Sequence, residues 1–428
     1  MTVSALKSLV TVCIGKAAQP LGQLTYVKDG AREYSVFAYD NSWLNDPARF
    51  EVSPDLALIK GHQSRRAPSR DDSCFHLALA DTEPDAWGRR VIARAHAKAR
   101  QTNPRLKALN ALDYLSAVDD FSRMGALRLQ HDSGSFLRTV EEGKRRTPPL
   151  VDLQRLFEAS RAVEGGHETT EDLTYLQGKG TSLGGMRPKC TVLDVDGSLA
   201  LGKFPSLMDA RQVTRAEVLA LRLAQRAGID AALARVELVG GTPVAVIRRF
   251  DRTADHGRIP YLSAASMLQA SRNEDRSYTE IADIIRAKCA NPSADAQQLW
   301  RRLVFNLLIT NVDDHLHNLG FLYVGLGQWR LAPHFDVNPF PDKDRESKTW
   351  LSEATGPITS LEMLMAQARY FSLPPTDALH VLAQVVAAVC DWRAVALSPA
   401  VGLVARELDD FVPAFEHSQI DAARGLLG

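Results

Sequence analysis

The sequence lacks the features that would place it in several common protein classes. Its five cysteines, among 428 residues, are far apart, and no two of them form a C-x-x-C pair. Their spacing therefore indicates neither a disulfide framework nor a cysteine zinc site. The amino terminus has no signal-peptide pattern, and no apolar run reaches the roughly 18 residues that span a bilayer. We expect a soluble, cytoplasmic protein with no membrane partner.

An excess of charge of one sign is also missing. Lys and Arg together number 51, Asp and Glu together also number 51, and the formal net charge is zero. This balance, without a long Lys/Arg run, argues against a dominant basic face for nucleic acid. Any contact with DNA is therefore expected to be indirect, through a partner. The length exceeds what a single hydrophobic core usually serves, so we expect two or three lobes.

Strand patterns dominate the start of the chain. Residues 9–14, 23–27 and 34–39 read as three short strands joined by turns, which predicts a β-meander. From residue 84 the apolar spacing becomes helical, and these helices are expected to pack on the meander. The stretch 132–150 is rich in Ser, Gly, Lys, Arg and Pro, which indicates a boundary.

The middle of the chain reads as strand, strand, helix, strand, strand. Residues 190–195 and 198–204 form the first predicted hairpin, with its turn at Asp196-Gly197. A helix that stops at Gly228 follows, and then a second hairpin over 236–247.

Helical spacing dominates after residue 262. One hairpin, 319–324 with 328–331, interrupts it, and the predicted helices cover 277–288, 294–310, 360–370, 376–393 and 400–427. The expected class is α+β, with a β-rich amino-terminal subdomain at 1–145, a middle lobe at 146–262 and a mainly helical lobe at 263–428.

The most informative motif begins at Asn311 and ends with the pair Phe335-Asp336. Asp313 and Asn318 lie five positions apart on one loop, and Asp336 follows the predicted hairpin. Phosphoryl transfer uses one carboxylate to orient the attacking hydroxyl, and an Asn with a second Asp to hold Mg²⁺. The pattern therefore makes Asp313 a candidate base, and Asn318 and Asp336 candidate metal ligands.

Other interpretations of this loop remain open. It could be a polar turn after a helix, because Asn and Asp also initiate turns. Asp314, which has no spacing argument, is expected to be solvent-exposed. A rival hypothesis is a transition-metal site built from imidazole and carboxylate groups, with the candidate ligands Asp313, His315, His317 and His334.

A second group of candidates lies in the predicted middle lobe, residues 146–262. The loop 181–189 contains Ser182, Gly184, Gly185 and Lys189 and precedes a strand, where glycines would let backbone amides approach phosphate. An ordinary turn would have the same composition.

Lys203 lies among apolar strand residues, where its ammonium could pair with nucleotide phosphates; an outward-pointing strand lysine is the alternative. Glu217 could restrain Lys203, but the Thr214-x-x-Glu217 pattern favours a helix capping box.

Taken together, these motifs resemble the HipA family of bacterial serine/threonine kinases. The likeness rests on the Ser182 loop, the Lys203 strand, the segment Arg249-Phe250-Asp251-Arg252, the 311–318 loop and the 331–336 segment. It spans nearly the whole chain, because residues 81–89 resemble that family's extra amino-terminal subdomain.

The resemblance implies a two-lobed fold related to protein and phosphatidylinositol kinases, with ATP and Mg²⁺ as co-substrates. It also implies a toxin role beside a small HipB-like helix-turn-helix antitoxin. Asp313 would be the catalytic base, Asn318 and Asp336 the metal ligands, and Lys203 the lysine that contacts ATP. Ser182 would be autophosphorylated, which would inactivate the kinase because a dianion there competes with ATP phosphates.

This chain departs from the best-known HipA pattern at the 186–188 loop, at His317, where a lysine is common, and at 261–265, which has no acidic hinge residue. By family analogy the protein substrate is an aminoacyl-tRNA synthetase. Two other functions stay open: a catalytically silent co-repressor scaffold bound to the antitoxin, and a metal-dependent phosphohydrolase.

Overall fold

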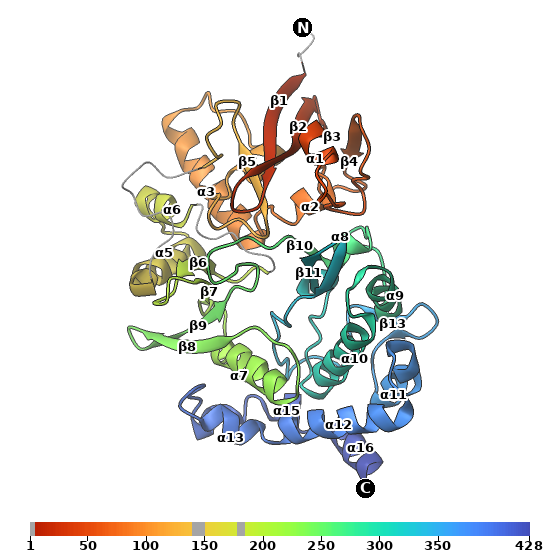
Figure 1. Cartoon of the computed structure of the whole chain (residues 1–428). Coiled ribbons are helices and arrows are strands. Elements are labelled where there is room, and N and C mark those ends of the chain that lie inside the picture. The colour runs from red at the N-terminus through yellow and green to blue at the C-terminus, as the bar shows by residue number, and fades with distance from the viewer. Residues whose placement is uncertain (1–4, 139–149, 178–184) are drawn as a thin grey trace. The chain divides into compact units, whose positions relative to one another are not determined.

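The computed structural model describes residues 5–138, 150–177 and 185–428 (Figure 1). Its mixture of helices and sheets confirms the α+β class. The chain divides into two compact units. The first comprises Met1–Gly202, Asp251–Arg272 and Gly325–Gly327, and the second comprises Lys203–Phe250, Asn273–Val324 and Gln328–Gly428.

A five-stranded sheet with the order β4-β3-β2-β1-β5 forms the core of the first unit. Side chains along its strands alternate between core and solvent, as a half-buried sheet requires; in β3, for example, Ser35, Phe37 and Tyr39 are buried. The predicted meander is confirmed by antiparallel pairing of the first three strands (Figure 1). The strands are β1 (Leu6–Ile14), β2 (Gln19–Asp29), β3 (Arg32–Tyr39), β4 (Gln63–Arg66) and β5 (Leu127–Gln130).

Helix α3 (Ala86–Thr102) confirms the predicted change to helix near residue 84. It begins at Asp85, whose Oδ1 accepts a hydrogen bond from the Gly88 amide at 2.8 Å. It packs against α6, and α6 packs against α5. The remaining elements of this unit are α1 (Asn41–Leu44), α2 (Leu77–Ala80), α4 (Ala111–Ser116), η1 (Leu150–Asp152), α5 (Leu153–Gly165), α6 (Thr170–Leu176), β6 (Lys189–Leu193), β10 (Tyr261–Ser263) and α8 (Ala264–Met267).

Buried charge organises the segment that follows Phe250. Asp251 is fully buried and accepts a hydrogen bond from the Gly125 amide at 2.8 Å. The Arg252 guanidinium pairs with the same carboxylate at 2.6 Å and donates to the Arg123 carbonyl at 2.7 Å. Their attraction and these hydrogen bonds offset part of the desolvation penalty that burial of the two ions carries.

The second unit begins at Lys203, the last residue of β7 (Leu199–Lys203). Helix α7 (Val213–Arg226) packs on the antiparallel pair β8 (Ala234–Val239) and β9 (Thr242–Arg248), which confirms the predicted second hairpin. Val218, Leu219 and Leu221 are among the fully buried residues of α7.

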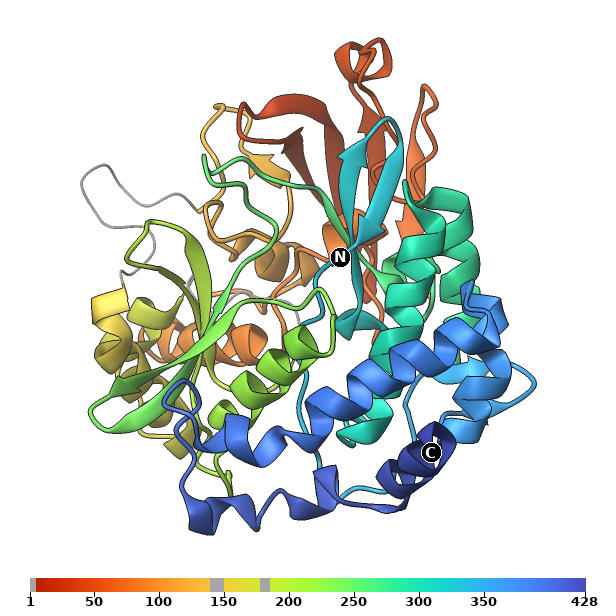
Figure 2. The same ribbon diagram turned by 60° about the horizontal axis from the view of Figure 1, so that its bottom comes forward.

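Helix α10 (Pro292–Leu308) runs through the helical part of the second unit and packs against α9 (Tyr278–Lys288) and α12 (Pro375–Cys390). Figure 2 shows α12 as the long blue helix, which also contacts α7 and the carboxy-terminal α16. The other helices are α11 (Leu361–Gln367), η3 (Ala368–Phe371), α13 (Trp392–Leu397), α14 (Ala405–Leu408), α15 (Val412–Phe415) and α16 (Ser418–Leu427).

The helical pattern predicted over 400–427 corresponds to three short helices rather than to one continuous helix. Pro413 lies in the first turn of α15, where a missing amide hydrogen costs nothing. A preceding helix cannot extend through Pro413, because the proline ring would clash with the previous turn and remove a hydrogen bond. The apolar spacing persists across the breaks because all three helices bury one face, including Leu408, Phe415 and Ile420.

The predicted hairpin between the two parts of the main motif is also present. Strands β11 (Gly320–Gly325) and β12 (Gln328–Leu331) are neighbours in one sheet. A smaller antiparallel pair, β13 (Trp350–Ser352) and β14 (Gly356–Pro357), follows.

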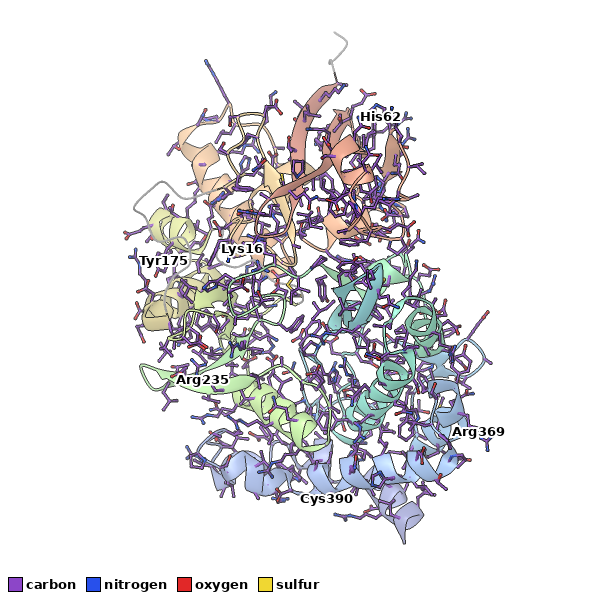
Figure 3. The ribbon with its side chains drawn as sticks, in the orientation of Figure 1. Lys16, His62, Tyr175, Arg235, Arg369 and Cys390 are labelled. Carbon is purple, nitrogen blue, oxygen red and sulfur yellow. The ribbon has the colours of Figure 1, made fainter. Side chains whose placement is uncertain are left out.

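All five cysteines are free thiols, four of them buried, while Cys390 is exposed at the end of α12 and is labelled in Figure 3. Among the residues that the structure describes, no helix combines the length and apolarity needed to cross a membrane.

Candidate active site

Helix α10 ends in a turn that directs the chain into the 311–318 loop. The Asn311 amide donates to the Asn306 carbonyl at 2.8 Å, and the Thr310 amide donates to the Leu307 carbonyl at 3.3 Å. These two bonds form a Schellman motif, in which Thr310 occupies the left-handed position with φ +55°. A β-branched residue is strained there, and such strain is characteristic of functional sites.

The loop then closes on itself through Asn318. The short 3₁₀ turn η2 (Leu316–Asn318) brings the Asn318 side chain back, and its Nδ2 donates to the Asp313 backbone carbonyl at 2.8 Å. The five-residue spacing seen in the sequence therefore places Asn318 directly beside Asp313. The Asp313 carboxylate remains 41% exposed and forms an ion pair with Lys348.

Asp314 is buried, so the expectation that it would be solvent-exposed is wrong. Its Oδ2 accepts a hydrogen bond from the Tyr278 hydroxyl at 2.6 Å, and its Oδ1 accepts one from the Lys348 amide at 2.7 Å. Burial raises the pKa of the Asp314 carboxyl to about 6, although these hydrogen bonds oppose the shift. Tyr278 lies 36 positions earlier in the chain, a separation at which no local pattern could reveal the contact.

Side chains of α10 hold the segment that leads to Asp336. The buried Arg302 guanidinium donates to the Ala332 carbonyl at 2.9 Å. About one helical turn later, Asn306 Oδ1 lies 3.1 Å from His334 Nε2. The same oxygen accepts a hydrogen bond from Asn311 Nδ2 at 3.1 Å. One buried amide therefore ties the helix to both halves of the motif.

This amide gives a first prediction. Asn306→Leu keeps the number of side-chain heavy atoms but leaves the buried donors of Asn311 and His334 unpaired, at a cost of roughly 1–3 kcal/mol each. We expect the thermal midpoint to fall by several degrees, as measured by circular dichroism. Asn41→Leu makes the same change at an exposed position. Equal thermal midpoints for the two variants would contradict the proposed role of the Asn306 hydrogen bonds.

Asp336 itself has φ +55°, a left-handed conformation that Asp tolerates better than most residues. Its Oδ1 lies 2.6 Å from Lys203 Nζ, and Glu217 Oε1 lies 2.5 Å from the same nitrogen. Burial disfavours the ammonium, but the two carboxylates outweigh this effect and raise the pKa of Lys203 above its ordinary value.

The predicted capping box at Thr214 and Glu217 is therefore wrong. Helix α7 begins at Val213, its cap residue Gln212 makes no side-chain cap, and the Thr214 hydroxyl donates to the Pro243 carbonyl at 3.0 Å. Glu217 is buried and pairs with Lys203 instead. The outward-pointing alternative for Lys203 is excluded as well, because its side chain is 9% exposed.

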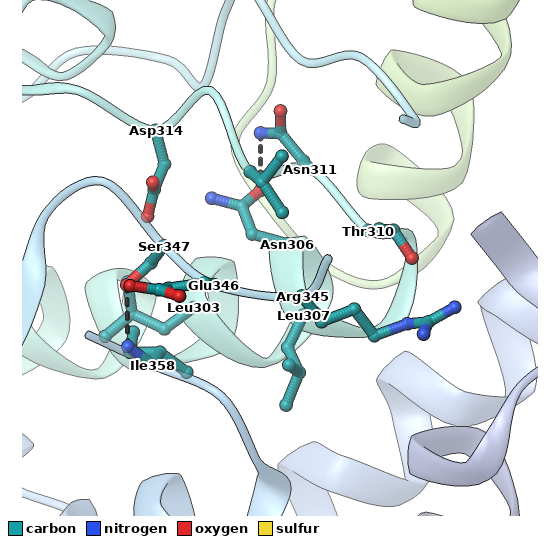
Figure 4. Close-up of a pocket in the computed structure, with 11 residues that line it drawn as sticks. Leu303, Asn306, Leu307, Thr310, Asn311, Asp314, Arg345, Glu346, Ser347 and Ile358 are labelled. Carbon is teal, nitrogen blue, oxygen red and sulfur yellow. Dashed lines mark hydrogen bonds between the residues drawn. The ribbon is translucent and has the colours of Figure 1, made fainter. Parts of the chain in front are cut away.

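Asn318 and Asp336 line one pocket of the second unit, together with His315, His334 and other side chains. A second pocket, shown in Figure 4, shares Asn306 and Asn311 with the first and is lined by residues that include parts of α10, the loop and the stretch 345–347. The two candidate metal ligands therefore share one cavity.

The donor atoms in that cavity suit a hard cation such as Mg²⁺. Asn318 Oδ1 is buried and has no hydrogen-bond partner within the described residues. A buried oxygen without a donor is unfavourable unless another group satisfies it. Together with the Asp336 carboxylate it would supply two of the oxygen ligands that Mg²⁺ takes in phosphoryl-transfer sites, where waters and phosphates complete the coordination.

The rival transition-metal cluster is not assembled in the described parts of the chain. No three side chains of His, Cys, Asp or Glu there are arranged to hold a metal ion. His334 is buried against Asn306, and burial lowers its pKa well below the ordinary value. His315 and His317 contact each other edge to face, with ring centroids 6.0 Å apart.

The candidate residues of the loop 181–189 belong to the first unit. Gly185 has φ +92°, which favours glycine, and Lys189 is buried with its Nζ 3.1 Å from Asp85. Ser182 and Gly184 lie outside the described residues.

Comparison with known proteins identifies the family. Residues 12–130 match the model of the HipA N-terminal domain, and residues 181–393 match that of the HipA-like C-terminal domain. The chain belongs to the HipA family, as the sequence motifs indicated.

One relative, "Putative kinase Y4mE" of Sinorhizobium fredii, is 25% identical over 366 residues, which cover 80% of this chain and 78% of the relative. "Putative kinase" of Haemophilus influenzae is 29% identical over 109 residues, or 23% of this chain and 32% of that protein.

A solved structure supports the fold over nearly the full length. It is described as the HipA, HipB and operator DNA complex of the Shewanella oneidensis toxin-antitoxin system. One chain of it matches with a TM-score of 0.66 and 15% identity, covering 97% of this chain and 96% of its own length. The predicted HipA type of fold is thus confirmed.

Proposed function

We propose that this chain is an ATP-dependent serine/threonine protein kinase that acts as the toxin of a type II toxin-antitoxin system. The observation that carries the proposal is the buried ion triad of Lys203 with Glu217 and Asp336. Kinases use a strand lysine, a helix glutamate and a metal-binding aspartate in this combination to position nucleotide phosphates. Asn318, whose buried Oδ1 has no partner among the described residues, would join Asp336 in holding Mg²⁺.

The proposed chemistry assigns one role to each side chain. Asp313 accepts the proton of a serine or threonine hydroxyl while the hydroxyl oxygen forms its bond to the γ-phosphorus. The bond between that phosphorus and the bridging oxygen breaks, and ADP leaves with the electron pair. Lys203 would contact the nucleotide phosphates, and Asn318 and Asp336 would hold Mg²⁺, which would supply positive charge beside the transferred group.

We propose the same nucleotide-binding role for the loop 181–189 as the sequence indicated. Gly184, Gly185 and Lys189 would bind the nucleotide, and Ser182 would be the autophosphorylated residue that switches the kinase off. These assignments rest on the family resemblance.

The proposed partners follow from family membership. The solved relative is described in complex with HipB and operator DNA. We propose a HipB-like helix-turn-helix antitoxin as partner here, DNA contact through it, and an aminoacyl-tRNA synthetase as protein substrate. Radiolabel transfer from ATP to purified synthetases tests the substrate directly.

Mass spectrometry tests the proposed kinase and its switch together. Wild-type protein incubated with Mg·ATP is expected to gain one phosphate on Ser182, because the family resemblance makes this serine the autophosphorylated residue. The Asp313→Ala variant is expected to gain none, because no base takes the hydroxyl proton. Intact mass and peptide mapping measure both results.

Ser182→Ala is expected to remain unmodified, whereas Ser198→Ala, a change at another loop serine, is expected to react like the wild type. Phosphate on a residue other than Ser182 would overturn the switch. Absence of phosphate and of nucleotide binding in folded, unmodified wild type would favour the scaffold alternative.

A further inference from the structure

The 311–318 loop contains no residue with a permanent positive charge. No Lys or Arg occurs between Arg302 and Arg330, a stretch that includes the whole loop and the first strand of its hairpin, β11. Transfer of a phosphoryl group nevertheless benefits from cations placed where its negative charge develops. A cation beside the Asp313 carboxylate must therefore come from another part of the chain.

The segment 347–349 reaches Asp313 from later in the chain, and Asp314 fixes its position. The Asp314 carboxylate accepts the hydrogen bond of the Lys348 amide, and the Asp314 carbonyl accepts one from the Thr349 hydroxyl at 2.8 Å. The buried Tyr278 hydroxyl holds the same carboxylate from the opposite side. Asp314 therefore acts as an anchor and not as a surface group.

A second set of hydrogen bonds holds the same segment from behind. The Ser347 amide donates to the Ile358 carbonyl at 3.1 Å, and the Ile358 amide donates to the Ser347 hydroxyl oxygen at 2.7 Å. The Ser347 hydroxyl donates in turn to the Thr349 carbonyl at 2.6 Å. Figure 4 shows the hydrogen bond between Ser347 and Ile358 as a dashed line. The backbone of Lys348 is thus fixed on both sides.

The Lys348 side chain, in contrast, is 57% exposed, and its ammonium pairs with the Asp313 carboxylate. An exposed ion pair adds little to stability, because water screens it and the lysine loses rotamer freedom. Several partly or fully buried hydrogen bonds around 347–349 therefore position a contact that contributes little to the fold.

We propose that Lys348 is a further catalytic residue, whose ammonium, held at Asp313 by the anchored 347–349 segment, contacts the phosphoryl group during its transfer. The inference rests on the proposed kinase function. The hydroxyl that Asp313 binds attacks the γ-phosphorus, so a cation in contact with Asp313 lies beside the transferred group. Lys348 would pair with Asp313 in the free protein and with phosphoryl oxygens during transfer.

Two measurements on Lys348→Ala test the proposal. The rate of ADP formation with Mg·ATP is expected to fall about 100-fold, the effect of removing one charge-stabilising donor. The affinity for the ATP analogue adenylyl imidodiphosphate, which retains a γ-phosphoryl group, is expected to fall about tenfold, while that for ADP is unchanged. The thermal midpoint should stay at the wild-type value.

Lys348→Arg is expected to recover most of the analogue affinity, because it restores the cation. Lys343→Ala removes an exposed lysine that precedes this segment and is expected to behave as wild type in both measurements. Equal loss of ADP and analogue affinity, or an unchanged or increased rate in Lys348→Ala, would overturn the inference. Wild type that neither binds nucleotide nor forms ADP would instead overturn the kinase function on which it rests.

Discussion

Asp313→Asn is expected to lower phosphoryl transfer by about 10²- to 10⁴-fold, the usual contribution of a positioned general base. The amide has nearly the same shape but cannot accept the hydroxyl proton. The backbone carbonyl of Asp313, which receives the Asn318 hydrogen bond, is unaffected, so the loop should keep its conformation. Radiolabel transfer from ATP measures the rate.

Nucleotide binding separates this effect from a general loss of structure. Lys203, Asn318 and Asp336 remain in this variant. The affinity for Mg·ATP should therefore stay within about twofold of the wild type, well short of a tenfold change, which corresponds to roughly 1.4 kcal/mol. Asp344→Asn, at an exposed position after Asp336, is the matched control and should transfer normally. A wild-type rate in Asp313→Asn would remove this residue from the proposed mechanism.

The parts of the fold and site that were predictable depend on short spacings. The meander strands alternate with period two, and the hairpins are marked by their turns, so local pattern suffices. The placement of Asn318 beside Asp313 follows from a single turn of chain. The extent of the helices was less accessible, because apolar spacing continues across the breaks on either side of α15.

The contacts that sequence reasoning missed connect residues far apart in the chain. Lys203 and Glu217 are 14 positions apart, and the local capping pattern at Thr214 offered a competing explanation for the glutamate. Asp314 was taken for a surface residue because its partners, Tyr278 and Lys348, lie more than 30 positions away.

One sequence feature bears on Lys348: Lys and Arg are absent from 303–329, the stretch that contains Asp313. That absence indicates that a cation is needed but does not say which one supplies it. Asp313 contacts Lys348 across 35 positions, and only the folded 347–349 segment makes that pairing visible.

Lys203→Met is expected to cause the largest loss of stability among these variants. Its removal leaves Glu217, with a side chain 5% exposed, and Asp336, 19% exposed, without their shared cation. Breaking a buried ion pair from one side costs about 3–5 kcal/mol. Because the pKa of Lys203 is raised, the wild-type contribution persists through neutral pH and is lost only as the pH rises above the ordinary lysine range. Urea denaturation near neutral pH measures the difference.

The double variant Lys203→Met, Glu217→Gln distinguishes the structural from the catalytic role of the lysine. Neutralising the more deeply buried carboxylate is expected to recover at least about half of the lost stability, since the remaining Asp336 is partly hydrated. Transfer should stay at least about 100-fold below wild type in both variants, because the nucleotide phosphates lose their cation. Lys343→Met makes the same chemical change at an exposed site and should be neutral. Recovery of transfer together with stability would mean that Lys203 serves the fold alone, and the ion triad would then no longer support a kinase.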